Sequence, residues 1–139
     1  MHAVYFAAKY PERVAGLYLD APVLNLLSCP AGVGIGGDDL YEEFVRHTGV
    51  TKSDLINYRN HPIDYVDVLV KNQIPIFLVV GDSDDVVPYV ENGKVLYEYY
   101  IKHNGDITLI IKEGAGHHPH GLNDNVALVD FVNRVYGLA

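Results

Sequence analysis

A histidine-rich loop, Lys112 to Leu122, follows a short apolar segment near the end of the chain. That segment, Asp106 to Ile111, is rich in β-branched residues and predicts a strand, and a helical pattern follows the loop. The histidines are therefore expected at the carboxyl edge of a parallel sheet, where catalytic groups collect. Gly114 and Gly116 predict a tight turn that lifts His117 clear of the sheet. An imidazole in this position could act as a general base.

An acid-rich turn, Gly81 to Pro88, follows the most apolar segment of the chain, Ile74 to Val80. A carboxylate at this strand end, facing a histidine on the loop of the next strand, would orient the imidazole and stabilise its protonated form. We expect Asp84 to make this hydrogen bond to His117. We expect Asp85 to cap the helix that follows the turn.

A second acid, Asp20, comes directly after another predicted strand, Val14 to Leu19. It is an alternative partner for His117, because it also lies at a strand end. The chain enters a long loop immediately after Asp20, however, whereas Asp84 lies within a defined turn. The sequence therefore favours Asp84 over Asp20 as the partner of His117.

The elements that must position these residues alternate between helices and strands. This order implies an α/β fold in one domain, residues 1–139, with three parallel strands and helices on both faces of the sheet. In the last helix, Val126, Val129, Phe131 and Val132 are expected to face inward. The expected helices are Met1 to Tyr10, Asp39 to His47, Thr51 to Tyr58, His61 to Lys71, Tyr89 to His103 and Leu122 to Tyr136.

Residues 24–71 are expected to form an insert above the sheet. Its first part, Leu24 to Asp39, is rich in glycine and small residues, and loops of this length are usually lids or binding loops. Short helices follow, the second of them capped by Thr51 or Ser53. The insert also supplies aromatic side chains that are expected to line a moderately polar substrate pocket: Tyr41, Tyr58 and Tyr65.

Composition excludes several classes of function. The formal charge is −8 and no basic run is present, which argues against a nucleic-acid partner. Apolar stretches are well short of the ~20 residues that span a membrane, and the first residues lack the features of a signal peptide. The one cysteine, Cys29, excludes an internal disulfide and lacks the strand-turn-helix setting of a nucleophile. No cofactor is predicted.

Three segments, taken in order, resemble the C-terminal half of the α/β-hydrolase family. Tyr10-Pro-Glu-Arg-Val14 is similar to the segment that joins the nucleophile helix to the sixth strand of that family. Gly81 to Pro88 is similar to the acid turn after its seventh strand, and Gly114-Ala-Gly-His117 is similar to the histidine turn after its eighth. The resemblance implies that Asp84 and His117 are the acid and base of a Ser-Asp-His triad.

The family's nucleophile lies in a G-x-S-x-G turn, which this sequence does not contain. By the register of Pro11 to Val14, the family's serine would fall roughly four residues before Met1. The resemblance therefore implies the C-terminal part of a serine hydrolase, which is expected to be inactive alone. It implies that the complete enzyme hydrolyses a small-molecule carboxylic ester, with carbohydrate esters as one candidate class. The serines present have other neighbours: Ser28, Ser53 and Ser83.

Two other functions stay open. The chain could be a non-catalytic α/β-hydrolase-like remnant or binding module, whose histidines are only loop residues. It could also be a metal-binding protein with His117, His118 and His120 as ligands, although adjacent histidines on a turn at Pro119 rarely converge on one ion. A zinc titration would separate this last function from the others.

The strand Val14 to Leu19 lacks the neighbour that it has on its far side in the complete α/β-hydrolase fold. An unpaired apolar edge is a template for association. The sequence therefore predicts self-association through this edge or a poorly stable chain, with Phe6 and neighbouring alanines exposed.

Overall fold

The structure is a computed structural model, and it describes residues 1–138. Its sheet has three parallel strands in the order β1-β2-β3, which are β1 (Leu17–Asp20), β2 (Ile76–Gly81) and β3 (Ile107–Lys112). Each strand begins one to three residues later than expected from the sequence. Because all three strands run in the same direction, their carboxyl ends lie at one edge of the sheet, and the loops after them meet there.

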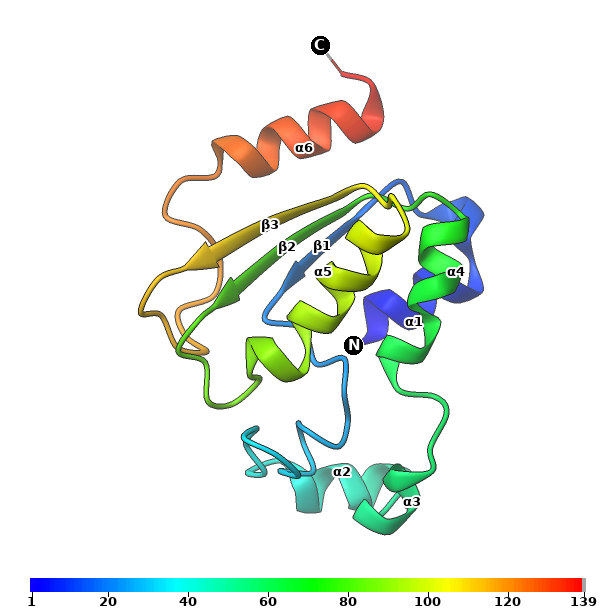
Figure 1. Ribbon diagram of the computed structural model, residues 1–139, viewed down its shortest axis with the longest axis vertical. Helices are drawn as coiled ribbons and strands as arrows, with labels where there is room; N and C mark the ends of the chain where they lie inside the picture. The colour runs from blue at the N-terminus through cyan, green and yellow to red at the C-terminus, as the bar shows by residue number, and fades with distance from the viewer. Residues whose placement is uncertain (139) are drawn as a thin grey trace.

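Helices cover both faces of the sheet (Figure 1). One face carries α1 (His2–Lys9), α4 (Val66–Lys71) and α5 (Gly93–Lys102), and the other carries α6 (Val126–Tyr136). Strand β2 is buried along its whole length, as a central strand covered on both faces must be. The expected α/β architecture is confirmed.

Side chains of β2 alternate between two hydrophobic clusters. Ile76, Leu78 and Val80 pack beneath α1, α4 and α5 together with Leu96 and Tyr100 of α5. The other cluster lies beneath α6 and contains Phe77, Val79 and Phe131. The strand is therefore fixed in register by burial on both sides.

Helix α6 buries a different face from the expected one. Phe131 is only 6% exposed, and its ring centroid lies 5.5 Å from that of Phe77. Leu128 and Val135 pack beside it at helical spacing. A neighbouring stripe of the helix is also apolar, and the large aromatic ring decides which stripe is buried. The inward orientation expected of three valines is wrong, because all are exposed: Val126, Val129 and Val132.

The insert between β1 and β2 has a small core of its own. It contains α2 (Tyr41–Thr48), α3 (Lys52–Ile56) and a 3₁₀ turn, η2 (Pro62–Tyr65), which leads into α4. In Figure 1, α2 and α3 lie apart from the sheet. Thr51, not Ser53, caps α3 in a capping box with Asp54. The core of the insert is formed by buried residues that do not touch the sheet's main cluster: Leu26, Ala31 and Leu55.

A buried asparagine divides the expected helix from Tyr89 to His103. The segment begins as a 3₁₀ turn, η3 (Tyr89–Glu91), and continues as α5 after Asn92. Asn92 Oδ1 accepts the backbone N–H groups of Leu24 and Asn25, both at 2.9 Å. Its Nδ2 donates to the carbonyl of Pro88 at 3.1 Å. Asn92 therefore ties the start of the insert to the start of α5.

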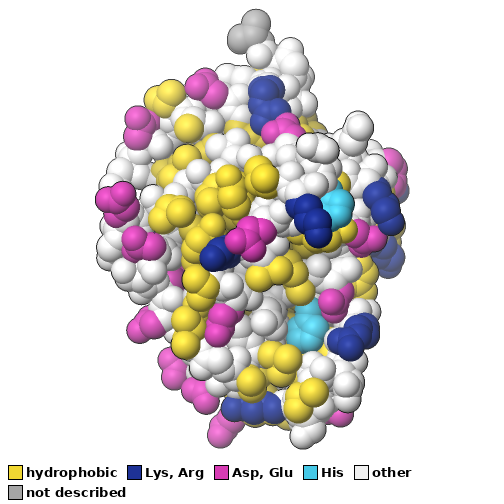
Figure 2. All heavy atoms as spheres, viewed as in Figure 1, with side chains coloured by type: hydrophobic (Ala, Val, Ile, Leu, Met, Phe, Trp, Pro, Cys, Tyr) yellow, Lys and Arg dark blue, Asp and Glu magenta, His cyan; other side chains and the backbone are white. Residues whose placement is uncertain are grey.

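Charges are scattered over the visible surface. On the face in Figure 2, lysines and arginines lie apart from one another among acidic and uncharged side chains.

One further 3₁₀ turn, η1 (Pro11–Arg13), joins α1 to the sheet. Within residues 1–138, no helix has the length and apolar character needed to cross a membrane.

Candidate active site

The turn after β2 holds Asp84 in a fixed orientation. Its Oδ1 accepts the backbone N–H groups of Val86 at 3.0 Å and Val87 at 2.8 Å, and its side chain is 1% exposed. The other oxygen, Oδ2, is thereby aimed at the loop after β3. Asp85 is exposed. The expected cap by Asp85 is wrong, because Asp84 itself takes the amide groups at the end of this turn.

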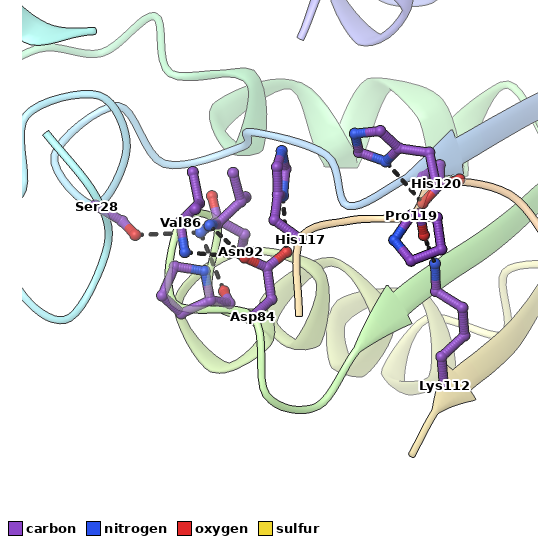
Figure 3. A network of polar contacts seen from close by, with 11 residues as sticks. Ser28, Asp84, Val86, Asn92, Lys112, His117, Pro119 and His120 are labelled. Atoms are coloured by element: carbon purple, nitrogen blue, oxygen red, sulfur yellow. Dashed lines mark hydrogen bonds and ion pairs between the residues drawn. The ribbon is translucent and has the colours of Figure 1, made fainter. Parts of the chain in front are cut away.

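The second oxygen of Asp84 accepts a hydrogen bond from the ring of His117. Its Nδ1 lies 2.9 Å from Asp84 Oδ2, and the contact is drawn in Figure 3. Because a carboxylate can only accept, Nδ1 donates, and the lone pair of the neutral ring is on Nε2. The hydrogen bond that the sequence led us to expect is therefore present. Chemically, the pair can accept a proton at Nε2 and stabilise the resulting imidazolium.

Backbone contacts between the two loops bring the acid to the histidine. Ser83 N–H donates to the carbonyl of Ala115 at 3.0 Å, and Gly114 N–H donates to Asp82 Oδ1 at 2.8 Å. A Cβ on Gly81 would lie 2.2 Å from the Ala115 carbonyl oxygen. Only glycine permits this approach, so Gly81 sets the distance between the acid turn and the histidine loop.

Asp20 pairs with a different histidine. Its Oδ1 lies 3.4 Å from Nδ1 of His120, and its Oδ2 accepts the N–H of Gly121 and the hydroxyl of Tyr18. Burial alone would raise the pKa of Asp20, but these hydrogen bonds and the charge of Lys112 outweigh it and lower the pKa. Burial and the Asp20 carboxylate raise the pKa of Tyr18 to about 12. The position of Asp20 at a strand end indicated that it would face the histidine loop. This position did not indicate that its partner would be His120 and not His117.

The three histidines of the loop lie together. Ring centroids are separated by 5.0 Å for His117 and His118, 4.8 Å for His117 and His120, and 4.7 Å for His118 and His120. Every pair is arranged edge to face. The loop is held by Lys112, whose Nζ donates to the carbonyls of Pro119 at 2.8 Å and Gly121 at 3.3 Å. The three histidines that the sequence offered as an alternative set of metal ligands therefore lie side by side on this loop.

A cavity of about 720 Å³ lies beside His117. Its walls come from the strand ends and from the insert, and they are mostly apolar, with Leu26, Pro30, Leu40, Phe44 and Val87 among them. The side chain of His117 is 20% exposed and lines this cavity. The pair is therefore accessible to a small molecule on the side away from Asp84.

The expected lining by three tyrosines is wrong. The rings of Tyr41 and Tyr58 pack in the core of the insert, and Tyr65 lies edge-on against Tyr5 of α1. Two of the hydroxyl groups are also engaged locally: that of Tyr41 accepts the N–H of Lys52 at 2.8 Å, and that of Tyr65 donates to Asn60 at 2.7 Å. Tyr41 and Tyr58 are used in the core of the insert and Tyr65 packs against α1, so none of the three rings is free to face a ligand.

Within residues 1–138, no serine hydroxyl is bonded to His117. Ser28 is buried and donates to Glu91 at 2.6 Å, Ser83 donates to Asp82, and Ser53 is on the exposed side of α3. Figure 3 shows the Ser28 side chain joined to Asn92, whose Nδ2 donates to the Ser28 hydroxyl at 3.2 Å. The hydroxyl groups of Ser28 and Ser83 therefore have structural partners.

Cys29 lines the cavity without the properties of a nucleophile. Burial raises the pKa of its thiol, and the charge of Asp84 raises it further. Because the thiolate is the reactive form, a raised pKa keeps this cysteine unreactive near neutral pH.

No protein-family model and no curated protein sequence matches the chain. Among solved structures it is similar to a puromycin hydrolase, with a TM-score of 0.66, 20% identity and 89% of this chain covered. It is also similar to the monoacylglycerol lipase of Paleococcus ferrophilus, with a TM-score of 0.52, 14% identity and 97% of this chain covered. The chain has the α/β-hydrolase fold.

Dipeptidyl peptidase 4 of Porphyromonas gingivalis is a further similar structure, with a TM-score of 0.50, 17% identity and 86% of this chain covered. The chain spans 18% of the puromycin hydrolase, 15% of the dipeptidyl peptidase and 62% of the lipase. It corresponds to the C-terminal portion of the α/β-hydrolase fold, as the sequence led us to expect. At these identities the likeness establishes the fold alone, and it assigns neither an activity nor a substrate to this chain.

Proposed function

We propose that this chain supplies the acid and base of a Ser-Asp-His triad in a serine hydrolase that acts on carboxylic esters. The observation that carries the proposal is the 2.9 Å hydrogen bond from His117 Nδ1 to the buried carboxylate of Asp84, on a ring that lines an apolar cavity. Asp84 is the acid and His117 the base, and each follows a neighbouring strand of an α/β-hydrolase sheet.

In this mechanism, His117 takes the hydroxyl proton of a serine through Nε2 as the serine oxygen attacks the ester carbonyl carbon. Asp84 stabilises the imidazolium that forms. The proton then goes to the departing alcohol as the ester C–O bond breaks, and a water molecule repeats the sequence to release the acid. Since no serine of residues 1–138 is bonded to His117, we infer that the nucleophile belongs to a preceding segment of a longer polypeptide.

Residues 24–71 would act as the lid over this site. Leu40 and Phe44 of the insert form one wall of the cavity, opposite the strand ends. Their apolar side chains suit an ester with an apolar acyl group. A carbohydrate ester has less support, because the tyrosines expected to bind it lie elsewhere.

The chain alone offers a first test. Residues 1–139 should hydrolyse p-nitrophenyl acetate no faster than free imidazole, and a fluorophosphonate probe should label no serine. Stoichiometric labelling of Ser28, Ser53 or Ser83 would contradict a nucleophile outside this segment.

A polypeptide extended upstream through a G-x-S-x-G turn provides the decisive test. It should hydrolyse p-nitrophenyl esters, and His117→Ala or Asp84→Asn should lower kcat by about 10⁴-fold. The matched control is His103→Ala, since His103 ends α5 far from the site in sequence and should leave kcat unchanged. Faster cleavage of p-nitroanilides than of esters would indicate a peptidase. An extended chain without labelling would favour the non-catalytic binding module.

A further inference from the structure

We infer that His117, His118 and His120 form a binding site for a transition-metal cation of the zinc type. One ring nitrogen from each histidine lies within 4.8 Å of the others. Nitrogen ligands at ~2.0–2.1 Å from a tetrahedral zinc ion are roughly 3.3 Å apart. Small rotations of exposed side chains close this difference, and His118 and His120 are both exposed.

Two of the three rings already carry the carboxylate partner that accompanies metal-binding histidines. Asp84 accepts from Nδ1 of His117 at 2.9 Å, and Asp20 lies 3.4 Å from Nδ1 of His120. Each contact places Nδ1 of the ring against a carboxylate, so that Nε2 carries the lone pair that can bind a metal ion. The two carboxylates also supply negative charge beside a bound cation.

The turn that carries His120 is held on both sides. Gly121 N–H donates to Asp20, and the Lys112 ammonium binds the carbonyls of Pro119 and Gly121. This anchoring reduces the conformational freedom lost on binding an ion. Three neutral imidazoles that leave one position open to solvent suit zinc, copper or nickel better than magnesium or calcium.

A metal ion at this site would also act on the proposed triad, and this consequence rests on the proposed function. Metal coordination uses the Nε2 lone pair of His117, the same lone pair that would accept the serine proton. Bound zinc should therefore inhibit the complete enzyme reversibly, while the binding itself requires no nucleophile.

Binding can be measured on residues 1–139 purified without a histidine tag and stripped with a chelator. Isothermal titration with zinc chloride should give one ion per chain, and zinc should raise Tm. His118→Asn and His120→Asn should weaken binding by more than tenfold, and Asp20→Asn by about 10–100-fold. His103→Asn, at the end of α5, is the matched control and should bind zinc unchanged.

Thermal melting distinguishes a misfolded variant from one that has lost only a metal-binding side chain. A folded His118→Asn chain should have the same Tm as the metal-free parent, and zinc should no longer raise that Tm. Equal affinity in the parent, His118→Asn and His120→Asn, or no heat and no Tm change in the parent, would overturn the site. In the extended enzyme, His118→Asn should keep esterase activity and lose zinc inhibition. Zinc binding together with no hydrolysis would support the site and remove only the proposed function.

Discussion

Oδ2 of Asp84 lies 2.9 Å from Nδ1 of His117, on a carboxylate whose other oxygen already accepts two backbone N–H groups. The acid is thus oriented by its own turn before it meets the histidine. A buried carboxylate with both oxygens engaged is a rigid acceptor, which is what a base with a defined tautomer requires.

The glycine between the two loops should be essential to this contact. In Gly81→Ala, the new Cβ would meet the Ala115 carbonyl oxygen at 2.2 Å, so the loops must move apart. We expect a loss of about 1–3 kcal/mol in the free energy of unfolding, together with a changed His117 resonance. The control is Gly116→Ala, where the nearest atom is 3.8 Å away. Equal stability of the two variants would contradict the close approach.

Lowering the pH should show how much the ionised carboxylate of Asp20 contributes to the stability of the fold. Because its pKa is lowered in the folded chain, the carboxylate stabilises the fold above the unfolded value of about 3.9. This contribution is lost as pH falls through the folded-state pKa. Asp20→Asn keeps an oxygen that can accept the Gly121 N–H, so it tests the charge. Its Tm should lie below that of the parent at pH 7, and the two should converge in acid. A difference that grows as pH falls would contradict the assignment.

The last helix tests which of its two apolar stripes holds it on the sheet. Phe131→Ala should cost about 3–5 kcal/mol, because Phe131 is buried against Phe77. Val129→Ala, on the exposed stripe, should change stability by no more than about 0.5 kcal/mol. Urea unfolding measures both. A larger loss from the valine variant would restore the orientation expected from the sequence.

The edge of β1 should promote association. Among the described strands its one neighbour is β2, and a hollow of about 410 Å³ beside it is lined by Phe6, Val14 and Tyr136. We expect light scattering to show self-association that grows with concentration. Phe6→Lys should reduce it, and Val95→Lys, an exposed position on α5, should not. A monodisperse monomer with a sharp melt above ~65 °C would show that the edge is protected.

The sequence predicts the Asp84 and His117 pair well, because both residues follow strands that are strongly apolar, and parallel strands bring their carboxyl ends to one edge. It does not predict the partner of Asp20 or the convergence of the histidines. Those depend on hydrogen bonds from Lys112 and Gly121 that form only once the loop has folded. The sequence also predicts the wrong position for the tyrosines of the insert. Aromatic residues suit a local core as well as a pocket wall, and the sequence does not distinguish the two.

The tautomer of His117 tests the central claim most directly. Nitrogen chemical shifts of the histidine rings, measured by NMR in the presence of a chelator, distinguish a protonated Nδ1 from a protonated Nε2. His61 is an internal reference with the opposite arrangement, because its Nδ1 accepts the Leu26 N–H at 3.0 Å. We predict a protonated Nδ1 and a free Nε2 for neutral His117, and loss of this preference in Asp84→Asn. A neutral His117 protonated mainly at Nε2, or one unchanged in Asp84→Asn, would contradict the account.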